Sequence, residues 1–251
     1  MATDITPRRT VLRMRAQSAP TVSLVLIVRN EEAGLRAVLP KIPTQVFDDL
    51  VAIDGHSTDA SVALLNGAGY RTMLQREKGL GAAMLEAREH VHTDCFVFFH
   101  PDGNEDPGDL PRMVDLLRDG NPFVVASRMI PGAWNEEDDK IFKWRKLANK
   151  GFIALANLCF AQGKNRTSDV TNGFRGVSCR AFDQMQLTSR DLTLDYQMCI
   201  RALKCNIPIT EFPTREGSRV AGDTNFPSIS TGVAEVKLLW RECRMGRRKV
   251  A

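Results

Sequence analysis

Residues 94–107 read Asp94-Cys-Phe-Val-Phe-Phe-His100-Pro-Asp102-Gly-Asn104-Glu-Asp106-Pro107, an apolar run followed at once by oxygen-bearing side chains. An apolar, β-prone run that gives way to Pro and Gly predicts a strand buried on both faces. In open α/β sheets, ligands bind beyond the carboxyl ends of such strands. We therefore expect the polar residues of this stretch to belong to a functional site.

Hard oxygen ligands follow the predicted strand. Asp102, Asn104 and Asp106 stand at alternate positions. Their oxygens suit a divalent cation such as Mg²⁺ or Mn²⁺ that keeps positions open for substrate phosphates. The alternative is an Asp-Gly turn followed by a helix that begins at Pro107. These residues alone leave both interpretations open.

The composition is that of an ordinary globular protein. The chain has 251 residues, 43% of them hydrophobic, so we expect one catalytic domain around one core. No apolar run approaches the roughly 20 residues that span a bilayer, and the arginine-containing N-terminus lacks the apolar core of a signal peptide. We therefore expect a cytoplasmic protein. The six cysteines form no Cys-x-x-Cys pair, which argues against disulfides and a zinc site.

The positive charge is concentrated at the carboxyl end. From Thr214 onward, eight Lys and Arg residues stand against four Asp and Glu residues, an excess equal to the formal net charge of +4. A helix predicted over 233–245, with a basic tail, suits the anionic surface of a membrane. The alternative is a helix packed on the core with a solvated tail. Nucleic acid is disfavoured because the basic residues are not interleaved with stacking aromatics. The sequence indicates no oligomeric state.

Predicted strands and helices alternate along the first half of the chain. Strands are expected at 22–28, 50–53, 70–74, 94–99 and 123–126. Helices are expected at 31–39, 58–66 with Ser57 as its cap, from about Gly81, and at 108–117. This alternation predicts an α/β fold with a mostly parallel sheet and helices on both faces. After Ser127 the alternation stops, and a long helix is expected at 144–160, with further helices near Ala181 and Thr193.

Three polar loops follow the first, second and fourth strands, at the same edge of the predicted sheet. A nucleotide needs polar side chains for its base and ribose, and Asp54 is a candidate acceptor for such a contact. Gly79-Leu-Gly81, with Arg76 and Lys78, offers amides and positive charge to phosphate at a helix start. The alternatives are a tight turn for the glycines and an ordinary helix cap for Ser57-Thr58-Asp59.

Seven motifs follow one another in a characteristic order. They are Leu26-Ile-Val-Arg-Asn30-Glu31-Glu32, Asp54-Gly-His-Ser57-Thr58-Asp59, Lys78-Gly-Leu-Gly81-Ala-Ala, Asp102-Gly-Asn-Glu-Asp106-Pro107, Ala126-Ser127-Arg128, Asp169-Val-Thr171-Asn-Gly173-Phe174-Arg175 and Arg219-Val-Ala-Gly222-Asp-Thr224-Asn225. In order and approximate spacing, over about residues 20–230, the set resembles glycosyltransferase family 2, in particular its dolichol-phosphate mannosyltransferase-like branch.

The resemblance implies a GT-A (Rossmann-like) fold, a nucleoside-diphosphate sugar donor and a divalent cation. The implied nucleotide-binding residues are Asn30, Glu31, Asp54, Ser57, Lys78 and Gly81. The implied metal ligands are Asp102, Asn104 and His100, and the catalytic candidates are Asp102, Asp195 and Arg128. The candidates for acceptor or phosphate binding are Arg175, Arg215 and Arg219. We expect a flexible basic N-terminus (1–20), a GT-A domain (21–227, with a nucleotide half to about 127 and an acceptor half after it), and a C-terminal helix and tail (228–251).

This chain departs from the family pattern at three positions. Ile27 stands where the family usually has Pro, Gly55 where it often has Asp, and His100 where its Asp-x-Asp metal motif begins. Because imidazole binds Mn²⁺ but is a poor Mg²⁺ ligand, the site is expected to favour Mn²⁺, to bind metal weakly, or to rely on Asp102 and water. A histidine that is merely hydrogen-bonded near the loop is the alternative for His100.

The expected function is inverting transfer of a hexose to a polyprenyl phosphate, with the protein peripheral at the cytoplasmic membrane face. A phosphate acceptor is already anionic, whereas a hydroxyl of a glycan or small molecule needs a base, for which Asp195 is the candidate. Asp195 could instead only cap or salt-bridge its helix. A sugar-1-phosphate nucleotidyltransferase is disfavoured because Arg29-Asn30-Glu31 replaces its glycine-rich loop after the first strand. A non-catalytic nucleotide-sugar binder stays open because of His100.

Overall fold

The computed structural model describes residues 19–134, 144–220 and 228–246. Three sequence predictions concern residues outside these ranges. They are the flexible N-terminus, the end of the last motif (Ala221 to Asn225) and the basic tail after Gly246.

Seven strands form one sheet in the order β3-β2-β1-β4-β6-β5-β7. Their bounds are β1 (Val22–Val28), β2 (Asp49–Asp54), β3 (Arg71–Leu74), β4 (Cys95–Phe99), β5 (Phe123–Ser127), β6 (Arg175–Ser178) and β7 (Ile209–Pro213). All neighbours pair in parallel except β6, which is antiparallel to both β4 and β5. The predicted mostly parallel sheet is confirmed, with one antiparallel strand near its centre.

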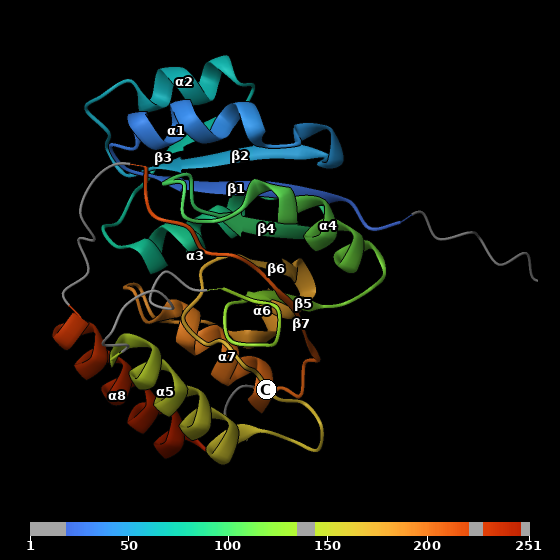
Figure 1. Cartoon of the computed structure of the whole chain (residues 1–251), viewed down its shortest axis with the longest axis vertical. Helices are drawn as coiled ribbons and strands as arrows, with labels where there is room; N and C mark the ends of the chain where they lie inside the picture. Colours follow the sequence, from blue (N-terminus) through green and yellow to red (C-terminus); the bar gives the residue numbers. More distant parts are fainter. Residues whose placement is uncertain (1–18, 135–143, 221–227, 247–251) are drawn as a thin grey trace, which may run out of the picture.

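Helices cover both faces of this sheet (Figure 1). The α-helices are α1 (Glu32–Val38), α2 (Ser61–Gly67), α3 (Leu80–His90), α4 (Leu110–Arg118), α5 (Trp144–Phe160), α6 (Cys179–Met185), α7 (Leu194–Lys204) and α8 (Ser228–Met245), and the 3-10 helices are η1 (Leu39–Lys41), η2 (Thr44–Val46) and η3 (Pro107–Asp109). Apolar residues of α1, α2 and α4 pack on one face, and those of α3, α6 and α7 pack on the other. In Figure 1, α5 and α8 lie side by side as an outer layer beyond α7.

Strand β4 separates the two halves of the core. Phe96 and Phe98 point into the cluster with α3, α6 and α7, whereas Val97 and Phe99 point into the cluster with α1 and α4. Alternate side chains of a strand point to opposite faces, so a wholly apolar strand fills both layers. The prediction that this strand is buried on both faces is confirmed.

Two strands and one helix cap differ from the sequence predictions. Strands β6 and β7 were not predicted, because short segments with charged residues lack a strand pattern. The prediction that Ser57 caps α2 is wrong, since this helix begins at Ser61 and has no side-chain cap. The Ser57 hydroxyl instead accepts the backbone N–H of Asn30 at 2.9 Å. None of the described helices is long and apolar enough to cross a membrane.

Close packing of α1 fixes the loop that follows β4. A Cβ atom at Gly34 would overlap the carbonyl oxygen of Pro101, one residue before Asp102. Because that neighbour is backbone, a side chain at Gly34 can be accommodated only if the loop or the helix moves.

Replacing this glycine should therefore destabilise the fold. We expect Gly34→Ala to lower the free energy of unfolding by about 1–3 kcal/mol, since overpacking forces the backbone to shift. Gly67→Ala is the matched control, because nothing lies within 4 Å of the added methyl group, and it should be neutral or stabilising by up to about 1 kcal/mol. Urea unfolding of both variants measures the difference. Equal stabilities would show that the contact at Gly34 does not constrain the loop.

Candidate active site

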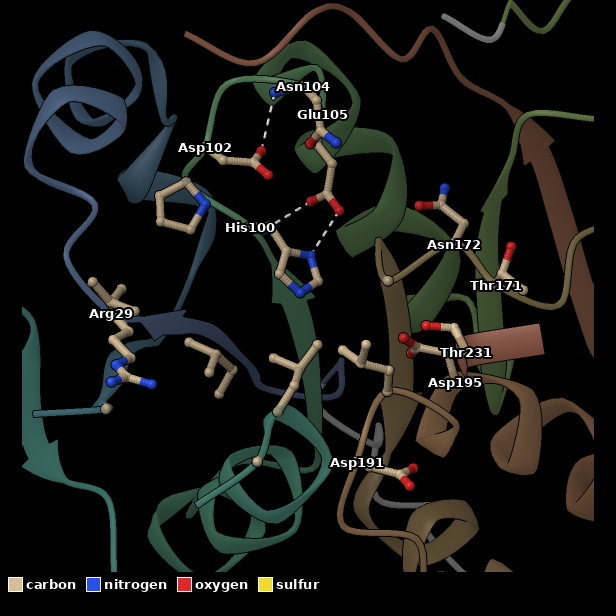
Figure 2. Close-up of a pocket in the computed structure, with 18 of the residues that line it drawn as sticks. Arg29, His100, Asp102, Asn104, Glu105, Thr171, Asn172, Asp191, Asp195 and Thr231 are labelled. Atoms are coloured by element: carbon tan, nitrogen blue, oxygen red, sulfur yellow. Dashed lines mark hydrogen bonds and ion pairs between the residues drawn. The ribbon is translucent and has the colours of Figure 1, made fainter. Parts of the chain in front are cut away.

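One pocket of about 1010 Å³ opens at the edge of the sheet where β1, β2, β4 and β5 end. Because β6 runs antiparallel, its first residues meet the carboxyl ends of β4 and β5 at this same edge. The pocket is lined by the loops after β1, β2, β3, β4, β5 and β7, by the loop before β6, by the start of α7, and by residues of α5 and α8. Figure 2 shows the β4 loop, Arg29 on one side, and Asp195 and Thr231 on the other.

Eight of the residues predicted to form the site line this pocket. They are Glu31, Lys78, His100, Asp102, Asn104, Arg128, Asp195 and Arg219. The other predicted residues are not among its lining residues. They are Asn30, Asp54, Ser57, Gly81, Arg175 and Arg215.

The predicted nucleotide residues outside the lining hold the loops together. Asn30 has a left-handed backbone (φ 54°) and accepts the Thr58 N–H at 2.8 Å through its side-chain oxygen. The Asp54 carboxylate accepts the Ser57 N–H at 3.1 and 3.2 Å. A Cβ atom at Gly81 would lie 2.6 Å from a backbone oxygen of the loop before α7, so only glycine fits there. In this structure these residues shape the edge of the pocket rather than line it.

Asp102 and Asn104 both line the pocket, and both carry side-chain oxygens (Figure 2). Oδ1 of Asp102 accepts the Asn104 N–H at 3.1 Å, and Oδ2 lies 3.2 Å from Nη2 of Arg219. The side-chain oxygen of Asn104 is buried and accepts no hydrogen bond from the residues that the structure describes. The segment after β7 pairs with this loop, because Val220 N–H donates to the Asp102 carbonyl at 2.9 Å and Gly217 N–H to the Asn104 carbonyl at 2.7 Å.

The protein oxygens at this position suit a cation that is also bound by substrate phosphates better than a cation bound by protein ligands alone. The described part of the chain contains no group of three or more His, Cys, Asp and Glu side chains that could hold a metal ion. A carboxylate together with an unsatisfied amide oxygen nevertheless suits Mg²⁺ or Mn²⁺, which takes its remaining ligands from substrate phosphates and water. The unpartnered Asn104 oxygen is the structural observation that favours such an ion.

His100 is held by a carboxylate of the same loop. Its Nδ1 lies 2.8 Å from Oε1 of Glu105, and its backbone N–H donates to Oε2 at 2.8 Å (Figure 2). Burial by itself would lower the pKa of His100, but the Glu105 carboxylate outweighs burial, with a further contribution from Asp102, and raises this pKa to about 9. This pairing favours the doubly protonated imidazole, which has no lone pair to offer a metal.

Arg128 is neutralised within the protein. Its guanidinium donates to Asp169 at 2.8 and 3.0 Å and to Glu216 at 2.9 Å, with a further bond to Thr171 at 3.0 Å. Although burial opposes its charge, the two carboxylates raise the pKa of Arg128. Arg128 therefore ties the end of β5 to the loop before β6 and to the segment after β7.

Arg175 lies beneath the pocket, wholly buried. Nε donates to the Asn172 carbonyl at 2.8 Å and lies 3.3 Å from Oδ1 of Asp195, while Nη1 donates to the Asp195 carbonyl at 2.8 Å. Burial raises the pKa of Asp195, and Arg175 opposes that rise. Arg215 stacks its guanidinium 5.9 Å from the Trp134 ring. The contacts of Arg175 show that it supports Asp195. Arg215 is not among the residues that line the pocket.

Sequence reasoning did not single out several lining residues. Arg29 follows β1 directly, and its position at a strand end was a signal that could have identified it. Glu105 stood in the stretch quoted first, but its partner His100 could not be recognised before the loop geometry was known. Glu235 comes from α8, far along the chain from the other motifs, and carried no local signal.

The comparisons with known proteins agree with this architecture. The model of the family described as Glycosyl transferase family 2 matches residues 23–185. A glycosyltransferase of Haloferax volcanii is 28% identical, over 85% of this chain and 70% of its own length. The dolichyl-phosphate hexose transferase of the same organism is 26% identical, over 88% of this chain and 93% of its own length. Two further archaeal relatives are longer, and the chain spans less than two thirds of each.

A solved structure resembles the whole described fold. Glucosyl-3-phosphoglycerate synthase of Mycobacterium tuberculosis, crystallised with Mn²⁺, uridine diphosphate and glucosyl-3-phosphoglycerate, has a TM-score of 0.68 and 19% identity, and the match covers 96% of this chain and 87% of that one. At this identity the likeness shows the fold alone, which is GT-A. With a family model that matches more than half of its residues, this chain is an enzyme of the hexosyltransferase type and belongs to glycosyltransferase family 2.

Proposed function

We propose that this enzyme transfers a hexose, with inversion, from a nucleoside-diphosphate sugar to a polyprenyl phosphate. The observation that carries the proposal is one pocket in which the oxygens of Asp102 and Asn104 lie among cationic side chains, with Arg219 only 3.2 Å from Asp102. Relatives named as dolichyl-phosphate or dolichol-phosphate sugar transferases support the choice of a lipid phosphate as acceptor.

The donor is assigned to the side of the pocket formed after β1 and β3. Arg29 and Lys78 line that side, next to Gly79 at the start of α3. Positive side chains and the N-terminus of a helix both favour a diphosphate. Glu31 also lines the pocket, and burial, followed by the nearby Asp102, raises its pKa. We assign Glu31 to the donor sugar or ribose, where a carboxyl group can accept or donate a hydrogen bond.

Asp102 and Asn104 are the proposed ligands of a divalent cation, Mn²⁺ or Mg²⁺. When bound there, the cation would stabilise the negative charge that develops on the leaving diphosphate. Arg219 lines the same part of the pocket and can bind phosphate oxygens there, from either the donor or the acceptor. An acceptor phosphate is already anionic at neutral pH, so its attack on the sugar requires no strong base.

A second candidate is transfer to a hydroxyl group. It is favoured by Asp195, a carboxyl group that lines the pocket and whose pKa burial raises, as is common for a general base. The structural neighbour that was crystallised with phosphoglyceric acid shows that an acceptor of this fold need not be a lipid.

A membrane surface is the proposed site of action. The outer helices expose large apolar side chains, which are Leu147, Leu155 and Leu158 on α5 and Val233, Val236 and Trp240 on α8. The guanidinium of Arg244 lies 4.5 Å from the Trp240 ring, so a cation accompanies the aromatic group. Apolar and basic groups on neighbouring helices are typical of proteins that rest on anionic lipid.

The cation proposal predicts the effect of removing one charge. Asp102→Asn should weaken Mn²⁺-dependent binding of nucleoside diphosphates and lower transfer by about 100-fold or more, because the amide is a poorer ligand for a divalent ion. The matched control is Asp106→Asn, at an exposed carboxylate four residues on that accepts the Gly108 N–H and is not among the lining residues. A thermal-shift panel of nucleoside diphosphates with and without Mn²⁺ measures binding. If Asp102→Asn keeps its cation dependence, the metal assignment is wrong.

The phosphate proposal separates two neighbouring arginines. Arg219→Gln should raise the apparent KM for nucleoside-diphosphate sugar, for polyprenyl phosphate, or for both by about 10-fold or more, since it removes charge-assisted hydrogen bonds. Arg215→Gln is the control, because Arg215 stacks on Trp134 and is absent from the pocket lining. Steady-state kinetics with each substrate varied measures both. Equal effects of the two substitutions would remove Arg219 from the phosphate site.

The membrane proposal predicts which exposed leucine matters. Leu158→Ala should lower the affinity for anionic phospholipid vesicles by roughly 10-fold, because a leucine buried in lipid contributes about 1.5–3 kcal/mol. Leu74→Ala, at an exposed leucine on β3, should leave it unchanged. Vesicle co-sedimentation at low salt measures both affinities. Indistinguishable binding of the two variants and the parent would reject this face.

A further inference from the structure

Helix α8 buries two glutamates seven residues apart, in very different surroundings. Glu242 is fully paired, because its carboxylate accepts from Gln197 at 3.0 Å, Arg201 at 3.0 Å and Lys204 at 2.6 Å, all on α7. Glu235 is 6% exposed and lines the pocket. Within the described ranges, no hydrogen bond or ion pair reaches its carboxyl group. The paired glutamate locks α8 to α7, and the unpaired one is thereby held at the pocket.

The described groups around Glu235 come from α5, α7 and the segment just before α7. The titratable groups that face it are Asp195 and Tyr196 from α7, and Lys146 of α5 and Asp191 line the same pocket. Tyr196 is engaged through its hydroxyl, which donates to a backbone carbonyl of α5 at 3.2 Å. Figure 2 places Asp195 and Thr231, one helical turn before Glu235, on the same side of the pocket.

Two carboxyl groups therefore lie at this side, and within the described ranges only Asp195 has an arginine at ion-pair distance. Asp195 has Arg175 at 3.3 Å, which favours its charged form. Burial, and then the neighbouring Asp195, raise the pKa of Glu235 to about 7. Burial raises the pKa of both carboxyl groups, but Arg175 opposes that rise at Asp195, so we assign the proton of the pair to Glu235.

We propose that Glu235 is an acceptor-binding residue that donates a hydrogen bond, from its neutral carboxyl group, to an oxygen of the acceptor phosphate. This inference rests on the proposed lipid-phosphate acceptor. Two ionised carboxylates at this side would repel a phosphate, whereas a protonated one offers it a donor. Glu235 would thus allow an anionic acceptor to bind beside Asp195.

The proton of Glu235 is retained during transfer. An oxygen of the acceptor phosphate forms a bond to the anomeric carbon as the bond from that carbon to the donor phosphate oxygen breaks, and the electron pair leaves with the nucleoside diphosphate. No proton needs to be removed from an anionic phosphate nucleophile. An uncharged side chain that donates a hydrogen bond should therefore be able to take over the role of Glu235. If Glu235 were a general base, such a side chain could not take over its role.

The pH dependence of Glu235→Gln tests this role. In the parent enzyme, kcat/KM for a short-chain polyprenyl phosphate should fall about 10-fold per pH unit above pH 7, as Glu235 loses its proton. Glu235→Gln should keep transfer within a few-fold of the parent at pH 7 and lose this alkaline fall. Glu235→Ala should be weaker at every pH. Asp115→Asn, at an exposed carboxylate of α4 outside the pocket, should follow the parent.

Thermal unfolding provides a readout that does not depend on activity. Because folding raises the pKa of Glu235 from 4.5 to about 7, its contribution to stability is fully present below pH 4.5 and is lost as the pH rises through 7. The melting temperature should therefore fall more between pH 5 and pH 8 in the parent than in Glu235→Gln. An equal fall in both proteins would overturn the protonated state.

The outcomes separate this inference from the proposed function. Loss of more than about 100-fold of transfer in Glu235→Gln at pH 7 would make Glu235 a base and overturn the inference. If Glu235→Gln kept the alkaline fall in kcat/KM, the inference would also be overturned. Transfer of sugar to the lipid phosphate would still support the proposed function. A parent enzyme that binds nucleoside diphosphate yet uses only hydroxyl acceptors would overturn both.

Discussion

The buried charge of Arg175 is the constraint around which the pocket is assembled. A guanidinium without solvent contact is strongly destabilising unless protein groups pair with it. Those groups come from the loop before β6, through the Asn172 carbonyl, and from the start of α7, through the Asp195 backbone and carboxylate. Because Arg175 is also the first residue of the antiparallel strand β6, its contacts bring that strand, the loop before it and α7 to one edge of the sheet.

A second, largely buried arginine, Arg128, is also paired with protein carboxylates and connects further segments of the site. Arg128 at the end of β5 is paired with Asp169 before β6 and with Glu216 after β7. The segment that contains Glu216 continues to Arg219, beside Asp102. Buried ion pairs are weak evidence for net stability, but losing one partner leaves an unpaired charge, so they specify one arrangement. The loops that line the pocket are therefore held at its edge by charge pairing across the sheet.

The groups proposed to bind the donor and the Asp195–Glu235 pair lie in different parts of the pocket. Arg29, Lys78, Asp102 and Asn104 belong to the β1, β3 and β4 loops, together with Glu31, Glu77 and Glu105, whereas Asp195 and Glu235 belong to α7 and α8. The first set is suited to a diphosphate and a cation. The second set would exclude an anion if both groups were ionised, so the protonation state of Glu235 links the choice of acceptor to the packing of α8 on α7.

Local sequence patterns predicted the helices, strands and loops whose conformation follows from their own residues. The apolar run of β4, the long helix α5 and the polar loops at strand ends follow from periodicity and turn chemistry. The ordered motifs also indicated the family, and eight of the predicted site residues line the pocket. The sequence by itself thus determined the fold class, the sheet edge that carries the site, and the metal-binding candidates Asp102 and Asn104.

Only the tertiary structure decided which polar side chains face the pocket. The four residues of β6 carry no strand pattern, and they form a strand because β4 and β5 both supply backbone partners. Arg175 and Arg219 are alike in sequence, yet one is buried under Asp195 and the other lines the pocket. Glu235 lies 40 residues after Asp195 and reaches it because α8 packs on α7, through Glu242 and the buried Leu238. Burial and pairing depend on neighbours distant in the chain, and a local pattern does not encode them.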